Sequence, residues 1–356
     1  MNNGNIVNDF RIKQSLETIQ KLLTNKNKII ITSHLGRPTE GVYEESLSLK
    51  PICKYLSALL ERDIKFFNSY RDNMNFEDYE IAMLENVRFN TGEKSSNSDL
   101  SKAYASLADY FVFDAFGVAH RKESSTFGVS EYLKTYPGLN ISNEIHTINQ
   151  LIHEDSRPMT IIISGAKVST KLIVIQKLLA KCDFMILGGG ILNTFLKAKG
   201  NEIGNSLYEE DLVNEAKNIL SSDFSSKIIF PIDLSCESES KPKNIDVSNI
   251  SNNDIIFDVG EKSLEHIKSI INKSAAIFWN GPLGYVEKEP FDRGTIELAK
   301  TIAEHNCFSI IGGGDTLPII ENLNLQSQFS CLSTGGGSLL SYLEGGDLPI
   351  LDKLDL

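Results

Sequence analysis

Short apolar runs separated by glycine-containing turns recur along most of this chain. The runs cover residues 29–32, 81–84, 110–113, 160–163, 184–187, 275–278, 308–311 and 331–332. Stretches with apolar residues at helical spacing lie between them, so strands are expected to alternate with helices. This alternation favours parallel, doubly wound α/β sheets, in which ligands bind at the carboxyl ends of the strands. The glycine-containing turns follow the runs and therefore lie at those ends.

The first helix is predicted over residues 9–24, ahead of any strand. Asn8 and Asp9 are candidate caps for it, because their short polar side chains can accept hydrogen bonds from free backbone N–H groups. Its apolar residues recur every three or four positions and share one face. They are Ile12, Leu16, Ile19 and Leu23.

The length of 356 residues exceeds what one hydrophobic core usually supports, so two domains are expected. A helical stretch at residues 142–153 interrupts the alternation and ends near Arg157 and Pro158. We interpret it as a helix between domains and place the boundary near residue 150. The polar, Ser- and Asn-rich segment 237–253 is predicted to be a surface excursion.

Composition removes several classes of function. The net charge of −12 argues against a nucleic-acid-binding or acidic-membrane surface. No apolar run approaches the roughly 18 residues that a membrane span requires, and the first residues do not resemble a signal peptide. The five scattered cysteines form no C-x-x-C pair and are expected to be reduced thiols. A cytoplasmic enzyme that does not bind nucleic acid or membrane is therefore expected.

Glycine-rich turns dominate the second half of the chain, at residues 188–190, 312–314 and 335–337. Glycine lets backbone N–H groups approach a phosphate, and a helix that begins there adds a favourable dipole. Asp315 and Thr316 follow one of these turns and offer hard oxygen ligands suited to Mg²⁺. Neither G-x-x-x-x-G-K-[ST] nor a G-x-G-x-x-G after a strand occurs, which excludes a P-loop and disfavours a dinucleotide oxidoreductase.

Arginine is concentrated in the turns of the first half. Of 8 arginines, against 27 lysines, four lie there, and two histidines accompany them as further candidate cations. The guanidinium group matches carboxylates and phosphates in shape and charge. One half is thus suited to a small polyanion and the other to a nucleotide, which suggests phosphoryl transfer across a cleft between domains. The residues are Arg11, His34, Arg37, Arg88, His120 and Arg121.

Eight motifs, in order along the chain, together resemble those of phosphoglycerate kinases. The resemblance implies two Rossmann-like domains joined by an interdomain helix, with a cleft between them. The N-terminal domain, 1–150, would bind 3-phosphoglycerate, the C-terminal domain, 151–340, would bind the nucleotide, and the tail 341–356 would pack back on the first. The motifs are SHLGRP (33–38), ENVRF (85–89), DAFGVAHRKESST (114–126), SGAKVSTK (164–171), LGGGILNTF (187–195), FWNGPLGYVE (278–287), IGGGDT (311–316) and STGGG (333–337).

The resemblance also implies individual roles. A substrate-binding set would consist of Arg11, His34, Leu35, Gly36, Arg37, Arg88 and Arg121. Lys167, with Arg11, Gly335, Gly336 and Gly337, would act on the transferred phosphoryl group. A nucleotide-binding set would consist of Lys171, Gly188, Gly189, Gly190, Gly260, Asn280, Glu287, Gly313, Gly314, Asp315 and Thr316, with Asp315 also a ligand of Mg²⁺. The reaction would be reversible transfer between ATP and the carboxylate of 3-phosphoglycerate, by a glycolytic monomer whose domains close on their ligands.

The chain departs from the family at its start and at Val118, where the family usually has threonine. The family's first strand and its turn, R-x-D-x-N-x-P, are not in this sequence, so the N-terminal sheet is expected to lack that strand and two polar substrate contacts. An alternative function is therefore a truncated remnant that binds nucleotide without full kinase activity.

Overall fold

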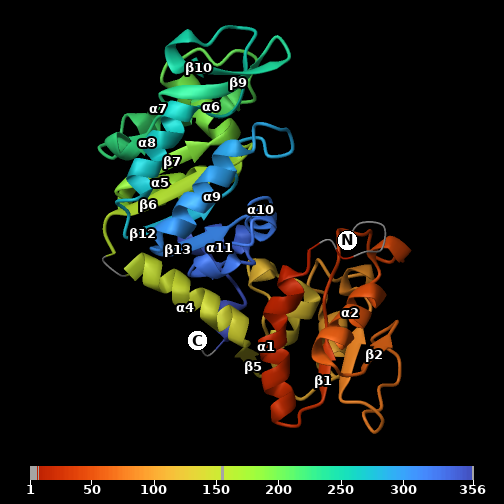
Figure 1. Ribbon diagram of the computed structural model, residues 1–356. Coiled ribbons are helices and arrows are strands. Elements are labelled where there is room, and N and C mark those ends of the chain that lie inside the picture. Colours follow the sequence, from red (N-terminus) through yellow and green to blue (C-terminus); the bar gives the residue numbers. More distant parts are fainter. Residues whose placement is uncertain (1–5, 7, 154–155, 355–356) are drawn as a thin grey trace. The chain divides into compact units, whose positions relative to one another are not determined.

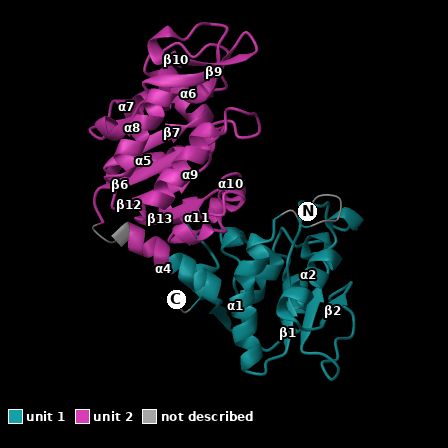
Figure 2. Ribbon diagram, in the orientation of Figure 1, with its two compact units in different colours: residues 1–145, 347–356 teal, residues 146–346 magenta. Residues whose placement is uncertain are grey.

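A computed structural model describes residue 6, residues 8–153 and residues 156–354 (Figure 1). The chain divides into two compact units (Figure 2). Unit 1 comprises residues 1–145 and 347–356, and unit 2 comprises residues 146–346. The chain therefore passes between the units at residues 145/146 and 346/347.

The strands of unit 1 form two parallel ladders. One has the order β1-β3-β2, with β1 (Ile29–Ile31), β2 (Ile64–Phe67) and β3 (Ile81–Leu84), and the other pairs β4 (Phe111–Phe113) with β5 (Thr135–Pro137). The longer helices are α1 (Phe10–Thr24), α2 (Lys50–Leu60), α3 (Ser98–Ala105) and the start of α4 (Leu139–His153). Short helices are η1 (Glu45–Leu47), η2 (Val87–Phe89), η3 (Phe116–Val118), the π-helix η4 (Ser124–Gly128) and η10 (Leu351–Lys353).

Strand β3 lies in the middle of the larger ladder of unit 1, and all four of its residues are buried. The predicted apolar face of α1 packs with Ile29 of β1 and Ile81 of β3. Asn8 caps this helix, since the Phe10 N–H donates to its Oδ1 over 3.1 Å. Asp9 provides no side-chain cap, because its carboxylate accepts instead from Tyr55 and pairs with Lys13.

Unit 2 contains a six-stranded parallel sheet of order β14-β13-β12-β6-β7-β8. Its strands are β6 (Met159–Ser164), β7 (Phe184–Gly188), β8 (Ile228–Ile229), β12 (Ala276–Asn280), β13 (Phe308–Gly312) and β14 (Cys331–Leu332). Its helices are α5 (Leu172–Lys181), α6 (Gly189–Ala198), α7 (Val213–Leu220), α8 (Glu261–Ile271), α9 (Arg293–His305), α10 (Leu317–Asn322) and α11 (Gly336–Leu343). Short helices are η5 (Val168–Thr170), η6 (Glu210–Leu212), η7 (Ser225–Lys227), η8 (Val247–Asn249) and η9 (Gln326–Gln328).

The central strands of this sheet are buried on both faces, as their continuous apolar runs predict. Trp279 of β12 is fully buried with residues of α8, α9 and α10. The predicted α/β class with parallel sheets is confirmed. Strand limits differ from the predicted runs by at most two residues. The parallel strands β2, β5 and β8 were not predicted from the sequence.

The polar segment 237–253, predicted to be a surface excursion, is exposed over much of its length but contains a strand. It contributes to an antiparallel sheet of order β10-β9-β11, formed by β9 (Asp233–Ser238), β10 (Lys241–Asp246) and β11 (Ile255–Val259). Four of the six residues of β10 are exposed, so the strand has no apolar alternation to reveal it. Its backbone hydrogen bonds to β9 hold it in place.

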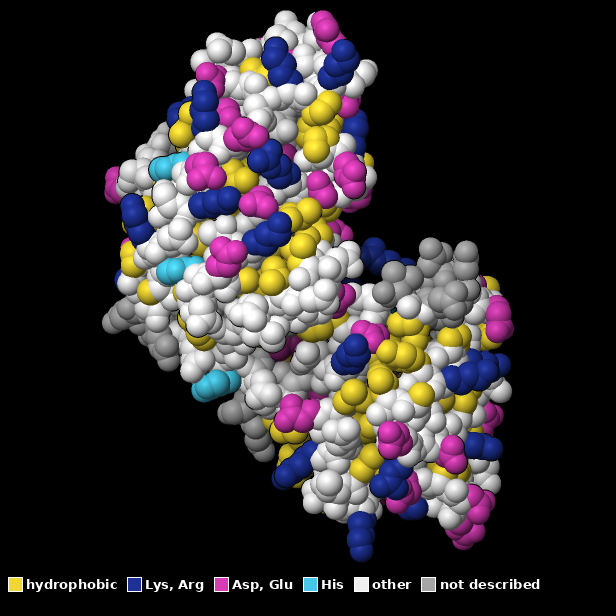
Figure 3. Space-filling view, in the orientation of Figure 1, with side chains coloured by type: hydrophobic (Ala, Val, Ile, Leu, Met, Phe, Trp, Pro, Cys, Tyr) yellow, Lys and Arg dark blue, Asp and Glu magenta, His cyan; other side chains and the backbone are white. Residues whose placement is uncertain are grey.

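The surface carries charges of both signs. On the face of unit 2 shown in Figure 3, Lys and Arg side chains are interspersed with Asp and Glu. Among the described residues, no helix is both long and apolar enough to cross a membrane.

Candidate functional site

The first group of candidate residues in unit 1 follows β1 and β3, which are adjacent parallel strands. The turn after β3 is tied to the turn after β1 by three hydrogen bonds. The Val87 N–H donates to the Ser33 carbonyl (3.1 Å), the Asn86 amide to the Leu35 carbonyl (2.8 Å), and the Arg88 guanidinium to the Gly36 carbonyl (2.9 Å). The SHLGRP and ENVRF segments therefore form one structure at the carboxyl end of the sheet, as expected for a ligand site.

The pKa of His34 reflects the positive charge of the residues around it. Burial, together with the positive charges of Arg88, Arg121 and Arg11, lowers its pKa to about 4. The site thus brings together arginines from α1 and from the turns after β3 and β4. At neutral pH His34 is uncharged, which corrects the sequence-based count of it as a cation. Arg37 is exposed on the same turn.

Glu123 contacts two of these arginines and was not predicted from the sequence. Its Oε1 lies 3.1 Å from Nη2 of Arg88 and 3.4 Å from Nη1 of Arg121. Arg88 is 4% exposed and Glu123 is 8% exposed at the side chain, so this pair is inside the unit. The signal available in the sequence was an acidic residue two positions after the His-Arg pair, but spacing alone cannot show which arginine it meets.

In unit 2 the candidate turns gather at the carboxyl ends of adjacent parallel strands β7, β6, β12 and β13. They approach one another closely. A Cβ on Gly189, whose φ is +60°, would lie 2.7 Å from the Gly165 carbonyl oxygen, and one on Gly281, at φ +96°, 2.1 Å from that of Ser164. Only glycine fits both the left-handed backbone and the available space. A Cβ on Gly313 would lie 3.2 Å from the Gly281 backbone nitrogen, and one on Gly336 would lie 3.7 Å from the Gly313 Cα.

Lys171 lies within this group of turns. Its ammonium donates to the Ser164 carbonyl over 2.5 Å and to Oδ1 of Asn280 over 2.7 Å. Burial lowers its pKa to about 8, and the charge of Asp315 acts in the opposite direction. The Asn280 Nδ2 atom is buried without a hydrogen-bond partner, so a donor remains for a ligand.

Lys167 and Lys171 do not share a helical face. The four-residue spacing would have aligned them if a helix began at Lys167, but α5 begins at Leu172 and a short 3₁₀ turn, η5, separates the two lysines. Lys167 is exposed with an extended backbone, whereas Lys171 is largely buried. The two lysines are therefore free to act on different parts of a ligand.

The remaining candidate residues of unit 2 belong to the same end of the sheet or to its loops. Asp315 is exposed, and the buried Thr316 hydroxyl has no hydrogen-bond partner. Gly335 and Gly336 stand at the start of α11, and Glu287 is exposed after β12. A carboxylate and an unpaired hydroxyl oxygen side by side fit a hard cation such as Mg²⁺, provided a ligand supplies further oxygens.

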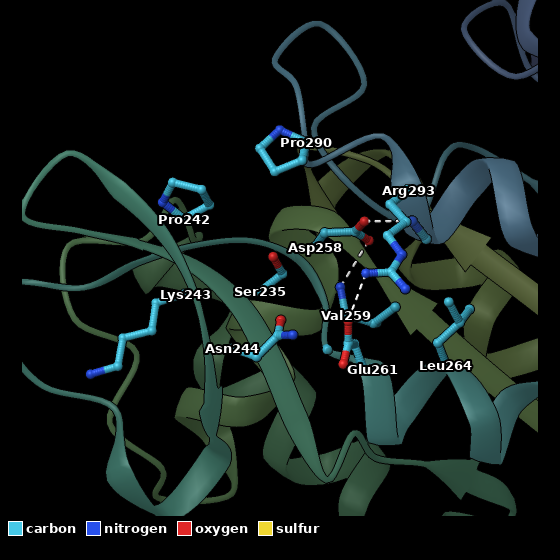
Figure 4. A pocket seen from close by; sticks show the side chains of 12 residues that line it. Ser235, Pro242, Lys243, Asn244, Asp258, Val259, Glu261, Leu264, Pro290 and Arg293 are labelled. Atoms are coloured by element: carbon cyan, nitrogen blue, oxygen red, sulfur yellow. Dashed lines mark hydrogen bonds and ion pairs between the residues drawn. The ribbon is translucent and has the colours of Figure 1, made fainter.

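Gly260 joins β11 to α8 and lines a cavity of about 140 Å³ (Figure 4). The cavity also borders Asp258, whose carboxylate accepts from the Gly294 N–H at the start of α9 (2.7 Å) and from the Val259 N–H (2.8 Å). Burial raises the pKa of Asp258 to about 7. Across the cavity, Arg293 pairs with Glu261 (2.7 Å). The charged groups of Asp258, Glu261 and Arg293 in this cavity therefore have partners within the protein.

Comparison with known proteins decides the family. The family model described as Phosphoglycerate kinase matches residues 1–346. The chain belongs to this family. Phosphoglycerate kinases of Francisella philomiragia and Francisella tularensis subsp. novicida are 41% and 42% identical to it, over 99% of this chain and 91% of their own length. Membership makes the chain a phosphotransferase with a carboxyl acceptor.

Solved structures agree. Phosphoglycerate kinase from Coxiella burnetii superimposes with a TM-score of 0.86 at 38% identity, covering 99% of this chain and 92% of that one. The enzyme from Pyrococcus horikoshii gives 0.87 at 28% identity with the same coverage. The similarity extends over both units, which argues against the alternative of a remnant limited to nucleotide binding.

Proposed function

We propose that this phosphoglycerate kinase transfers a phosphoryl group reversibly between ATP and the carboxylate of 3-phosphoglycerate, with ADP and 1,3-bisphosphoglycerate on the other side. The observation that carries the proposal is the pairing of two unlike sites on one chain. Unit 1 gathers arginines around a neutral His34, and unit 2 gathers glycine turns around the half-buried Lys171.

Unit 1 would hold 3-phosphoglycerate. Arg11, Arg88 and Arg121 supply the positive charge that acts on His34, and Arg37 is exposed beside it. Guanidinium groups bind both the phosphate and the carboxylate of such a substrate. A neutral His34 can donate one hydrogen bond and accept another, so it recognises a hydroxyl group better than a cation would. Leu35 and Gly36 complete the turn.

Unit 2 would hold the nucleotide. Lys171, Gly313, Gly314 and Thr316 would contact its phosphates, and Asp315 would hold the Mg²⁺ that accompanies them. The Mg²⁺ would neutralise phosphate charge. The remaining expected contacts are Gly188, Gly189, Gly190 and Gly260 around the adenine, Asn280 near the phosphates and Glu287 at the ribose.

The transfer needs no general base. The attacking carboxylate is already ionised at pH 7, so catalysis rests on position and on neutralising the charge of the phosphoryl group. Lys167, which is exposed, would follow that group during transfer, with Arg11 on the substrate side. Gly335, Gly336 and Gly337 at the start of α11 would offer backbone N–H donors to it.

The ligands must meet away from water, because water would otherwise accept the phosphoryl group. We propose that the two units close on their ligands and that product release follows reopening. We further propose that the enzyme acts as a cytoplasmic monomer whose partners are these small molecules, without nucleic acid or membrane.

A coupled assay tests the proposed function. The purified 356-residue chain is supplied with Mg²⁺, ATP and 3-phosphoglycerate, and 1,3-bisphosphoglycerate is detected through its reduction by a dehydrogenase with NADH. Turnover that requires all three components is expected. Calorimetric binding of ADP without any turnover or 3-phosphoglycerate binding would instead identify the remnant.

A further inference from the structure

We propose that Glu123 is a positioning residue that holds the guanidinium groups of Arg88 and Arg121 in the orientation that receives 3-phosphoglycerate. The inference rests on the proposed function, because it concerns how that same site is built. It assigns Glu123 no contact with substrate. It predicts that a negative charge inside an anion-binding site strengthens binding, which is the opposite of what charge alone would do.

One carboxylate serves both arginines. Oε1 of Glu123 accepts from Nη2 of Arg88 (3.1 Å) and Nη1 of Arg121 (3.4 Å), and Oε2 lies 3.5 Å from the same Nη2. The two arginines come from different segments, one after β3 and one after β4. Without a shared acceptor, two neighbouring guanidinium groups would repel each other, and their side chains would separate. Glu123 therefore fixes the distance between them.

The backbone around Glu123 is rigid enough for this task. Its carbonyl accepts from the N–H groups of Thr126 (3.2 Å) and Gly128 (3.0 Å). The next residue, Ser124, donates its N–H to the Glu93 carbonyl (2.8 Å) and its hydroxyl to the Gly92 carbonyl (2.9 Å). The start of the π-helix η4 is thus fastened to the loop after η2. A carboxylate on such a support has a defined place, as a residue that orients others requires.

Arg88 makes a second hydrogen bond within the protein and has one unpaired donor. Nη1 donates to the Gly36 carbonyl over 2.9 Å, while Nη2 is held by Glu123. Its Nε is buried and has no hydrogen-bond partner. Buried donors are nearly always paired in folded proteins, so an unpaired one in a candidate site favours an acceptor that arrives with the ligand. Glu123 thus orients an arginine that retains a donor for the substrate.

The test compares Glu123→Gln and Glu123→Asp with the wild-type chain. Glutamine keeps the length and loses the charge, whereas aspartate keeps the charge and shortens the reach. Both changes are expected to raise KM for 3-phosphoglycerate about tenfold or more, as for loss of a charge-assisted contact, and to leave KM for ATP within twofold. Glu131→Gln is the matched control, since Glu131 is exposed in the same unit, and its kinetics should equal those of the wild type.

The alternative outcomes are distinct. If Glu123 acts only through its charge, Glu123→Gln tightens 3-phosphoglycerate binding and Glu123→Asp changes little, which overturns the proposal. Unchanged kinetics in both variants also overturn it. If Glu123→Gln does not fold, a cycle combining Glu123→Asp with Arg121→Lys decides, because a positioning role predicts a combined effect clearly smaller than the sum. An inactive wild type would contradict the proposed function, whereas an active wild type with indifferent variants would contradict this inference alone.

Discussion

The candidate sites of the two units are built by opposite means. In unit 1 the positive charge comes from long arginine side chains, which need partners such as Glu123 and the Gly36 carbonyl to hold them. In unit 2 the candidate contacts are mostly backbone N–H groups on glycine turns, fixed by the strands that precede them. Side-chain sites lose orientation when a partner is removed, whereas backbone sites are lost when a Cβ is added.

The sheets of the two units also differ, in how many strands each one joins. Unit 2 has one six-stranded parallel sheet, while the described strands of unit 1 form separate ladders of three and two strands. The continuous sheet presents four adjacent strand ends to one ligand region. In unit 1, arginines from α1 and from the turn after β4 must reach the turns after β1 and β3. Sites on rigid elements need fewer supporting contacts than sites assembled by side chains.

The largest expected effect concerns Lys167, which we propose acts on the phosphoryl group during transfer. Lys167→Ala is expected to lower kcat by on the order of 100-fold or more, because it removes a charge that acts mainly on the moving phosphoryl group. Nucleotide affinity should change little. Steady-state kinetics measure kcat, and calorimetric titration with ADP measures nucleotide affinity. A variant with near-normal turnover would show that Lys167 does not stabilise the transferred phosphoryl group.

A glycine substitution tests the backbone side of the comparison. Gly189→Ala forces a left-handed residue and places a Cβ 2.7 Å from the Gly165 carbonyl, so a loss of about 1–3 kcal/mol in stability and weaker nucleotide binding are expected. Gly200→Ala is the control, since Gly200 also has a positive φ, +93°, but nothing within 4 Å of the added atom.

Thermal denaturation and ADP titration of both glycine variants separate the effect of the left-handed backbone angle from that of the steric clash between the added Cβ and the Gly165 carbonyl. Equal losses in the two would mean that the backbone angle alone matters. The close approach of the turns would then not be a requirement for nucleotide binding.

Asp315→Asn tests whether the two ligands bind independently. The variant is expected to weaken binding of Mg²⁺-nucleotide about tenfold, corresponding to roughly 1.4 kcal/mol, and to leave 3-phosphoglycerate binding unchanged. The reason is that Asp315 belongs to unit 2 and the arginines belong to unit 1. Separate calorimetric titrations decide, and equal weakening of both ligands would mean that the residues are assigned to the wrong sites.

The smallest effect is a fraction of a proton at Lys171. Its pKa of about 8 lies below the ordinary lysine value, so the free enzyme loses this proton as pH rises through 8. Bound phosphates favour the charged form, and ADP binding near pH 9 should therefore take up a proton that binding at pH 7 does not. Calorimetry in buffers of different ionisation enthalpy measures this uptake, and Lys171→Met should abolish it.

The lowered pKa of Lys171 also makes the stability of the protein depend on pH. Between pH 8 and the ordinary lysine range the unfolded chain binds more protons than the folded one, so the Lys171 contribution to stability rises with pH there. Below pH 8 the cost of burying the charge is fully present.

Local sequence was enough to predict most of the parallel strands and the identity of the glycine turns. The run 81–84 matches β3 because a buried parallel strand is apolar along its whole length. The run 331–332 matches β14, a half-buried strand at the edge of its sheet. The candidate residues were identified from the family motifs, because most of these motifs lie in the turns that follow the strands. Strand β10 escaped prediction because its backbone pairing, and not its side chains, makes it a strand.

What only the tertiary structure decided is the state of the side chains once they are packed. The sequence counted His34 as a cation, but burial among arginines keeps it neutral. The sequence would place Lys167 and Lys171 on one helical face if a helix began at Lys167, but a 3₁₀ turn separates them. It gave Glu123 no role, although that residue meets Arg88, 35 positions earlier in the chain. Charge, burial and pairing depend on neighbours that are distant in sequence, and folding alone brings these together.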